Sequence, residues 1–375
     1  MRPHPTGCVY EWRFNRSALT IDPSAFAALL AGGGLNSSKN EYRVKACLEK
    51  ERESAHDSQR WELHFRTANG RAERILSLAH PAVAARLLSC QANATLSFVG
   101  DSYLLQLFAS LARALIEWTR RADGSFRWRN SRRASADMEA AVHDDVPTLH
   151  VLPHNLTLRF HRSNQFQTLS SVDPLHAAVG KRMRAEQLAV VPSQSFLRAI
   201  RPPCAHRYVV QTGAWFAITR FWPPWMKYID MVNATTRRLR QHCPHSRVTW
   251  LPPTQQHGGV QAALHLPTCV HTKQLINRSV FEAALRATQS SRLFGGGKNA
   301  NTNIAHRKQL LDFEGGSLDV LDTSLIGQAR ADSHYDVKDN CGHWCLPGVP
   351  DVFGGALVRH LCEDDLPNPR SCTAL

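Results

Sequence analysis

A short apolar run, a glycine-led turn and a long helical pattern follow one another between residues 96 and 118, and this unit constrains the fold most strongly. Residues 96–99 (LSFV) have the composition of a buried strand, which stops at Gly100. Leucine and phenylalanine then recur at helical spacing from Tyr103 to Trp118. A strand that turns directly into an amphipathic helix is typical of the first unit of an α/β sheet.

Later segments predict further elements of the same sheet. Strands are predicted over 156–160, 208–210, 247–251 and 318–321, and helices over 81–88 and 228–241. Strands that alternate with helices favour a mostly parallel sheet that is covered on both faces. We therefore expect an α/β catalytic domain over residues 91–375, preceded by an N-terminal region, residues 1–90, of uncertain fold.

The cysteines and asparagines indicate an oxidising compartment. The ten cysteines are spread along the chain without a CxxC pair, so disulfides are expected rather than zinc ribbons. Six Asn-x-Ser/Thr sequons accompany them, at Asn15, Asn36, Asn93, Asn155, Asn233 and Asn277. The first residues show no apolar signal segment, and no stretch has the ~18 apolar residues of a membrane span. We expect a secretory-pathway protein whose N-terminal membrane anchor is missing from this sequence, with a cytosolic protein as the alternative.

The formal net charge of +14 predicts attraction to polyanions. No nucleic-acid-binding motif accompanies the charge, so we expect no nucleic-acid partner. The segment from Arg120 to Arg133 interleaves basic residues with Phe126 and Trp128. It has two interpretations: a solvated basic loop, or a surface that stacks on sugars and pairs with their acidic groups.

The turn Gly100-Asp101-Ser102 is the first candidate for chemistry. Open α/β sheets bind ligands at the carboxyl ends of their strands. The N-terminus of the following helix offers free N–H groups and the positive end of a dipole, which together stabilise an oxyanion. The alternative is purely structural, because Asp and Ser are common helix N-caps and Gly is a common turn residue.

The second candidate lies near the far end of the chain, in residues 339–351 (DNCGHWCLPGVPD). Cysteines and prolines restrict this backbone, so it can hold the imidazole of His343 in the orientation that a general base requires. A nearby carboxylate would orient that ring. Asp339 and Asn340 lie four and three residues before His343.

A metal site is an alternative for the same stretch. Suitable ligand chemistry is available from Cys341, His343, Cys345 and His334. In an oxidising compartment those thiols more often form disulfides, so we expect no metal.

The two motifs together resemble those of the trichome-birefringence-like proteins, which are plant-type polysaccharide O-acetyltransferases of the PC-esterase group. That family carries Gly-Asp-Ser and, later, Asp-Cys-x-His-Trp-Cys-Leu-Pro-Gly; residues 100–102 and 341–348 correspond to them. Weaker correspondences lie between the two motifs in the family's order, at residues 155–160, 211–216, 252–257 and 330–334. The resemblance spans residues 95 to 362.

Some positions depart from the family pattern. Asn340 stands where the family has its catalytic Asp, Leu105 and Gln106 replace an Arg-Asn pair, and Ala214 replaces a His. Nucleophile and base are retained, while the orienting group is open between Asp339 and Asn340. This choice matters, because Asn in place of the acid costs on the order of 10⁴ in turnover in serine proteases.

The resemblance implies an SGNH/GDSL-like three-layer α/β/α sandwich. It also implies a serine nucleophile, Ser102, activated by His343 with Asp339 or Asn340 behind it. Oxyanion and substrate contacts are assigned to Gly100 and Asp101 of the turn, and the order of the motifs adds Asn155 and Gly213.

The resemblance further implies a polysaccharide O-acetyltransferase of the Golgi lumen, with a secreted enzyme as the alternative. The expected acceptor is a polysaccharide. It is an acidic polysaccharide if the basic surface of the protein takes part in binding it. No cofactor is expected beyond an acetyl donor as co-substrate, for example acetyl-CoA. A carbohydrate esterase and a catalytically impaired glycan-binding protein are the alternative functions.

Overall fold

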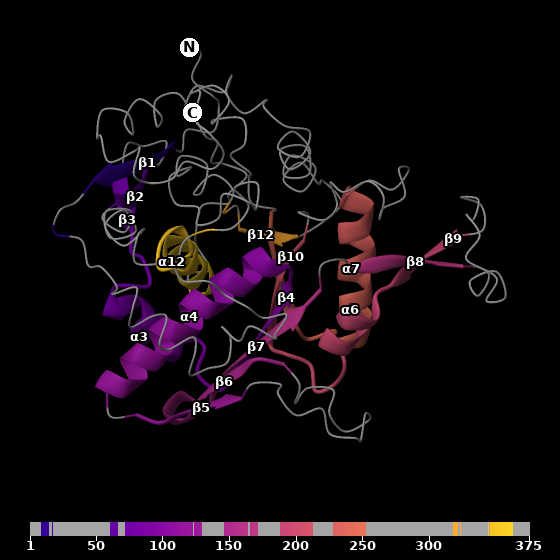
Figure 1. The fold of residues 1–375 in the computed structure, drawn as a ribbon, viewed down its shortest axis with the longest axis horizontal. Coiled ribbons are helices and arrows are strands. Elements are labelled where there is room, and N and C mark those ends of the chain that lie inside the picture. Colours follow the sequence, from indigo (N-terminus) through magenta and orange to yellow (C-terminus); the bar gives the residue numbers. More distant parts are fainter. Residues whose placement is uncertain are drawn as a thin grey trace, which may run out of the picture.

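The computed structural model describes residues 9–14, 17, 61–66, 72–122, 124–129, 146–163, 166–171, 188–212, 228–252, 318–321, 323, 344 and 346–362. Their main feature is a seven-stranded sheet in the order β12-β11-β10-β4-β7-β6-β5 (Figure 1). The strands are β4 (Thr95–Gly100), β5 (Phe126–Arg129), β6 (Thr148–Val151), β7 (Leu156–Arg162), β10 (Arg207–Gln211), β11 (Arg247–Leu251) and β12 (Asp319–Val320).

The five strands from β12 to β7 are parallel, and β6 and β5 add an antiparallel edge. The parallel strands are the five that the sequence predicted. After β4 the chain builds β5, β6 and β7 on one side of it, and then β10, β11 and β12 on the other. The strand order therefore reverses at β4. In open α/β sheets, the carboxyl end of the strand at such a reversal is where ligands bind.

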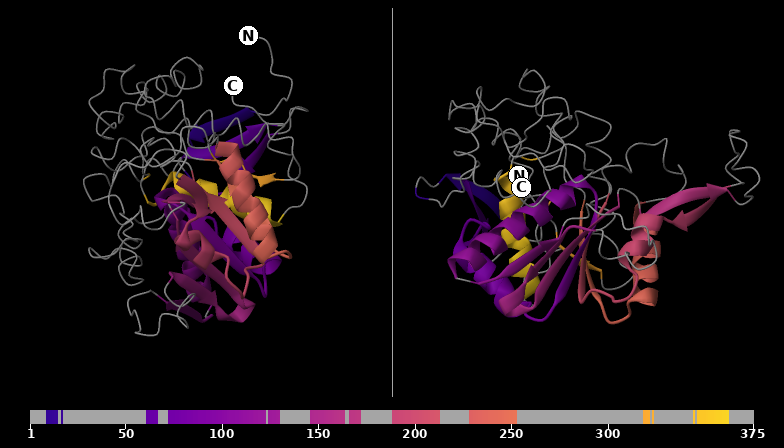
Figure 2. Two further views of the ribbon diagram at one scale, coloured as in Figure 1. Left: turned by 90° about the vertical axis from the view of Figure 1, so that its right-hand side faces the viewer. Right: turned by 60° about the horizontal axis from the view of Figure 1, so that its bottom comes forward.

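Helices cover both faces of the sheet (Figures 1 and 2). One face carries α3 (Pro81–Cys90), α4 (Ser102–Arg121) and α12 (Val349–Cys362); the other carries α6 (Gln194–Ala199) and α7 (Tyr228–His242). Two separate apolar clusters fill the spaces between the sheet and these layers. Side chains of β4 alternate between the two clusters, because Phe98 faces the α4 side and Val99 faces the α7 side. The expected three-layer α/β/α architecture is confirmed.

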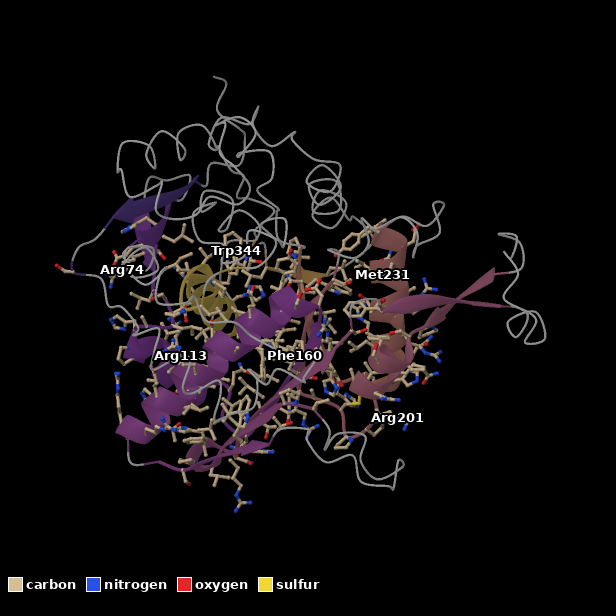
Figure 3. The ribbon with its side chains drawn as sticks, in the orientation of Figure 1. Arg74, Arg113, Phe160, Arg201, Met231 and Trp344 are labelled. Atoms are coloured by element: carbon tan, nitrogen blue, oxygen red, sulfur yellow. A yellow bond between two sulfur atoms is a disulfide. The ribbon has the colours of Figure 1, made fainter. Side chains whose placement is uncertain are left out.

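The amphipathic pattern predicted that helix α4 is buried along one stripe. In the structure, α4 is buried on almost all sides. Every residue from Leu104 to Ile116 is buried, because the sheet lies on one side and α3 and α12 on the other. The buried guanidinium of Arg113 bonds Asp351 of α12 at 3.1 Å and Glu117 at 2.7 Å (Figure 3). This pairing compensates much of the cost of burying the charge.

Asp351 also organises the start of α12. Its second carboxylate oxygen accepts from the backbone N–H of Gly348 at 2.7 Å, next to the first turn of the helix. Burial raises the pKa of Asp351, while the charge of Arg113 and the Gly348 N–H oppose that shift. Further along α12, an added Cβ on Gly355 would lie 1.8 Å from the carbonyl oxygen of Leu76. Only glycine therefore permits this close contact.

The N-terminal region contributes an antiparallel sheet of β1 (Val9–Phe14), β2 (Trp61–Arg66) and β3 (Ala72–Ile75). A two-stranded ribbon, β8 (Gln167–Ser171) with β9 (Leu188–Pro192), projects from the α6 side (Figure 1).

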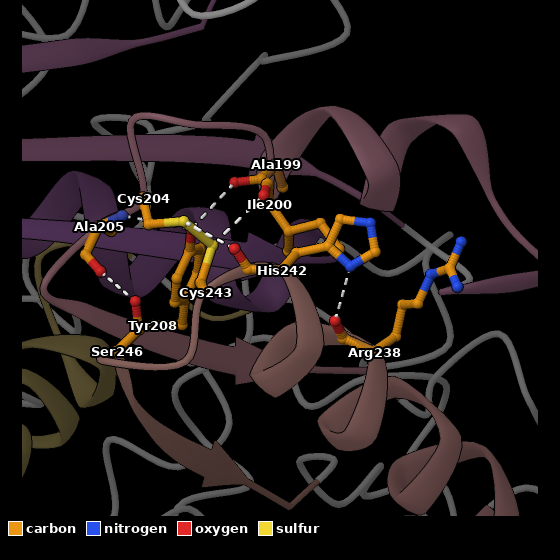
Figure 4. The surroundings of a disulfide bond; sticks show 9 residues. All are labelled: Ala199, Ile200, Cys204, Ala205, Tyr208, Arg238, His242, Cys243 and Ser246. Atoms are coloured by element: carbon orange, nitrogen blue, oxygen red, sulfur yellow. Dashed lines mark hydrogen bonds between the residues drawn. A yellow bond between two sulfur atoms is a disulfide. The ribbon is translucent and has the colours of Figure 1, made fainter.

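Two disulfides join distant segments, as the even cysteine count predicted. Cys90 at the end of α3 bonds Cys362 at the end of α12, and Cys204 bonds Cys243 after α7 (Figure 4). Among the helices that the structure describes, none combines the length and apolarity that crossing a membrane requires.

Candidate active site

Gly100 ends β4 between two neighbouring strands, in register with Gln211 of β10 and Arg162 of β7. A Cβ at this position would lie 2.4 Å from the carbonyl oxygen of Gln211, so no larger residue fits. The carbonyl of Gly100 accepts from the N–H of Ser163 at 2.8 Å. The peptide that leads into the turn is thus fixed from both sides.

Asp101 and Ser102 have different roles at the start of α4. The buried carboxylate of Asp101 caps the helix by accepting from the N–H of Tyr103 at 3.0 Å. The structural interpretation therefore holds for Asp101. Ser102 is the first residue of α4 and is only partly buried, so its hydroxyl lies at the helix N-terminus beyond the carboxyl end of β4. It remains the candidate nucleophile.

Tyr228 holds the carboxyl end of the neighbouring strand. It begins α7, is fully buried, and donates its hydroxyl to the carbonyl of Thr212 at 2.9 Å, directly after β10. Burial raises the pKa of Tyr228, and the negative charge of Asp101 raises it further, so the phenol remains a donor. The carbonyl of Thr212 and the N–H of Gly213 belong to the same peptide bond. Gly213 itself lies outside the described residues.

The C-terminal motif contacts α4 through Gln106. The side-chain amide of Gln106 donates to the carbonyl of Trp344 at 2.7 Å and accepts from the N–H of Trp344 at 3.1 Å. Gln106 lies one turn after Ser102, about 6 Å along the helix axis. The Trp344 ring is buried against Phe353 of α12, edge to face at 5.9 Å (Figure 3). Main chain 242 residues after Ser102 therefore lies against the first turns of the helix that Ser102 opens.

The other predicted residues of that motif, Asp339, Asn340 and His343, lie outside the described residues, as do Cys341 and Cys345. The described end of the motif is Trp344 and the residues from Leu346 to Asp351.

Asn155 does not lie beside the Gly100–Ser102 turn. It precedes β7 in a left-handed conformation (φ 47°), and its side-chain amide donates to Asn93 at 3.2 Å. Asn93 precedes β4, which runs parallel to β7. Six residues of strand, about 16 Å, separate this amino edge from the carboxyl edge. The predicted oxyanion contact from Asn155 is therefore not supported, and we remove it from the site.

The basic aromatic segment is partly a strand rather than a loop. Residues 126–129 form β5, and the ring of Trp128 packs on Phe108 with ring centroids 6.1 Å apart. Phe126 packs against the same core, with Arg120 over its ring at 5.6 Å. Both rings are partly buried against the core, so a sugar could stack only on the part of each ring that stays exposed.

Three described residues that the sequence analysis did not assign to the site hold peptides within it: Gln106, Ser163 and Tyr228. Gln106 was noted only as a departure from the family pattern. A polar residue inside the apolar pattern of 104–116 was the available signal. The hydroxyl of Ser163 lies 3.0 Å from that of Ser195, which ties β7 to α6. No local pattern indicated Ser163 or Tyr228.

Comparison with known protein families decides the identity. The sequence profile of PC-Esterase, the GDSL/SGNH-like acyl-esterase family found in Pmr5 and Cas1p, matches residues 82–360. The chain belongs to the PC-esterase family. The match begins inside α3 and ends inside α12, so the domain includes both helix layers and the whole sheet. A search of curated proteins found no match. Acyl-ester chemistry is thus shown for this PC-esterase at the level of its family.

Proposed function

We propose that this PC-esterase is a polysaccharide O-acetyltransferase with Ser102 as its nucleophile and His343 as its base. The hydrogen bonds between Gln106 and Trp344 carry this proposal. The N–H that Gln106 accepts belongs to the peptide bond joining residues 343 and 344. His343 is therefore one covalent step from main chain that is fixed against the helix begun by Ser102, which supports a meeting of the two side chains.

In the first half-reaction the Ser102 hydroxyl attacks the carbonyl carbon of an acetyl donor, and His343 takes the hydroxyl proton. Free N–H groups at the start of α4 stabilise the oxyanion, and the N–H of Gly213 is the proposed second donor. The leaving group departs with the proton from His343, and acetyl-Ser102 remains. The donor is an activated acetyl ester or thioester, for example acetyl-CoA.

In the second half-reaction a sugar hydroxyl replaces the leaving group. His343 takes its proton as the sugar oxygen attacks acetyl-Ser102, and the proton then returns to the serine oxygen as that bond breaks. The products are the acetylated polysaccharide and free enzyme. The proposed setting is the Golgi lumen, or outside the cell if the protein is secreted.

Ser102→Ala tests the mechanism. Transfer of acetyl from a chromogenic acetyl ester to an oligosaccharide should fall by a factor on the order of 10⁴, with the thermal midpoint unchanged. Ser110→Ala is the matched control, because it removes a hydroxyl from the same helix at a fully buried position without affecting the turn. The control should keep full activity. Undiminished transfer by Ser102→Ala would exclude the mechanism.

A carbohydrate esterase is the second candidate, favoured by the acyl-esterase description of the family. The same acetyl-Ser102 would then react with water. Product analysis at increasing oligosaccharide concentration separates the two. A transferase diverts acetyl from free acetate to the sugar as acceptor rises, whereas an esterase releases acetate at a constant rate.

The orienting group is tested by Asp339→Asn and Asn340→Asp. If Asp339 orients His343, Asp339→Asn lowers turnover strongly and Asn340→Asp has little effect. If Asn340 holds that position, Asn340→Asp raises turnover, because a carboxylate stabilises the imidazolium. If intact-protein mass measurement detects no acetyl-Ser102 in the wild type or in either variant, the glycan-binding alternative is supported instead.

A further inference from the structure

Positive charge is concentrated in the segments that carry α6 and α7. Residues 193–212 and 228–252 contain no glutamate or lysine, one aspartate (Asp230) and seven arginines: Arg198, Arg201, Arg207, Arg237, Arg238, Arg240 and Arg247. These two segments therefore contribute +6 of the formal net charge of +14, from 45 of the 375 residues. Six of the arginines are exposed; Arg207 alone is buried.

The two segments meet at one end of the molecule. The Cys204–Cys243 disulfide joins them, and the sulfur of Cys243 lies 3.3 Å from the carbonyl oxygen of Ile200 (Figure 4). The N–H of Arg247 also donates to the carbonyl of His206 at 3.0 Å. The ends of α6 and α7 are thereby held side by side. We call the six exposed arginines the α6–α7 basic patch: Arg198, Arg201, Arg237, Arg238, Arg240 and Arg247.

The patch lies at the amino edge of the sheet. Strands β10 and β11 begin at Arg207 and Arg247, next to the patch, and run toward the edge at which Ser102 lies. A five-residue strand separates the two edges by about 13 Å. An acetyl group at Ser102 therefore lies far from the patch, and an extended polymer is long enough to contact both.

Helix ends account for only part of this charge. Cations near a helix C-terminus interact favourably with the dipole, which applies to Arg198 and to the arginines of α7. Arg201 and Arg247 lie outside the helices. The guanidinium of Arg238 points away from the disulfide (Figure 4), and Arg201 lies at the same end of the molecule (Figure 3).

We propose that the α6–α7 basic patch is a secondary binding surface for an acidic polysaccharide, separate from the catalytic turn. Arginine suits this role because its planar fork pairs with carboxylate or sulfate oxygens through two hydrogen bonds, which lysine cannot do. The choice of a polysaccharide over other polyanions rests on the proposed function. The acidic groups are uronic-acid carboxylates or sulfate esters, which share this chemistry.

The test is equilibrium binding of the full chain to fluorescent polygalacturonate and dextran sulfate, with neutral dextran as the uncharged reference. The patch variant is Arg198→Gln/Arg237→Gln/Arg238→Gln. Its matched control, Arg86→Gln/Arg121→Gln/Arg127→Gln, removes three exposed arginines from the α3, α4 and β5 side. All six positions are exposed, so neither variant disturbs the core.

We expect the wild type to bind an acidic polymer and not dextran, and the tighter of the two acidic polymers identifies the acidic group. The patch variant should lose at least tenfold in affinity, and the slope of log affinity against log salt should become shallower by about two. The control should change by less than twofold. Equal losses in the two variants, or no binding of either acidic polymer, would overturn the proposal.

Two further measurements distinguish failure of the proposed binding surface from failure of the proposed catalytic mechanism. Duplex DNA bound more tightly than both acidic polysaccharides, with the same loss in the patch variant, would assign the surface to nucleic acid and reject the proposal. Ser102→Ala should bind polymer like the wild type. A failed catalytic mechanism would thus leave polymer binding intact, and a failed patch would leave acetyl transfer to short oligosaccharides intact.

Discussion

The side-chain amide of Gln106 occupies both polar groups of the Trp344 main chain, at 2.7 and 3.1 Å, in a buried part of the domain. One amide thus bonds both a donor and an acceptor of the buried Trp344 main chain. It joins the second turn of α4 to the C-terminal motif across 238 residues of sequence.

Gln106→Leu should therefore lower turnover. The substitution releases the main chain next to His343, and a displacement of about 1 Å at a catalytic group can cost 10²-fold. We expect kcat to fall by roughly that factor with KM changed less than twofold. The matched control is Gln91→Leu, because Gln91 donates to the carbonyl of Leu361 at 3.1 Å near the opposite end of α12. A similar loss of kcat in both variants would contradict a local role for Gln106.

Tyr228→Phe should affect the oxyanion site. The variant leaves the Thr212 carbonyl without its donor and frees the peptide that carries the Gly213 N–H. We expect about a tenfold lower kcat, a nearly unchanged KM and a stability loss of about 1–3 kcal/mol. Tyr208→Phe is the control, since Tyr208 is also buried but donates to Ala199 near the amino edge. Stability loss without a kcat change in Tyr228→Phe would exclude a positioning role.

Arg113→Met should be strongly destabilising. It leaves the Asp351 carboxylate buried without its cation, and breaking one side of a buried pair typically costs about 3–5 kcal/mol. Arg74→Met is the comparison, because its ion pair with Glu62 at 3.0 Å is partly exposed and such pairs contribute about 0–1 kcal/mol. Chemical unfolding of both variants measures the difference. Equal losses would show that burial of the Arg113–Asp351 pair is unimportant.

The pair of Asp319 and His360 should make stability depend on acid pH. Burial alone would raise the pKa of Asp319, but the hydrogen bond and charge of His360 at 2.7 Å, with the Thr249 hydroxyl, lower it below its usual range. A lowered carboxyl pKa stabilises the fold above the unfolded value of about 3.9, and this contribution disappears as pH falls through the folded pKa.

Asp319→Asn should accordingly be less stable than the wild type at pH 6. The difference should stay below about 1 kcal/mol, because the carboxylate is 42% exposed and screened by solvent. Unfolding curves between pH 6 and 2 should show the difference shrinking below pH 4. A difference that stays constant over this range would assign it to packing instead of charge.

The sequence by itself determined the parallel centre of the fold. β4 was visible as a short buried apolar run, β7 as an alternating pattern, and β10, β11 and β12 as short strand-like segments between turns and helices. The edge strand β5 was taken as part of a basic segment, since its alternation of Phe126 and Trp128 with arginine spans only four residues. The family was also determined by sequence, because the short Gly-Asp-Ser turn, the long motif at residues 341–348 and the weaker segments between them keep the family's order.

Tertiary structure alone decided which distant residues meet. Asn155 belongs to a motif in the family's order, yet parallel strands place it at the edge opposite Ser102. Gln106 is a polar residue within an apolar helix pattern, and the structure explains it by its hydrogen bonds to the main chain of Trp344. Arg113 likewise finds Asp351 only through packing. Local sequence reports the period and polarity of one segment, whereas such partners are separated by up to 238 residues and are joined only when the sheet and its helix layers assemble.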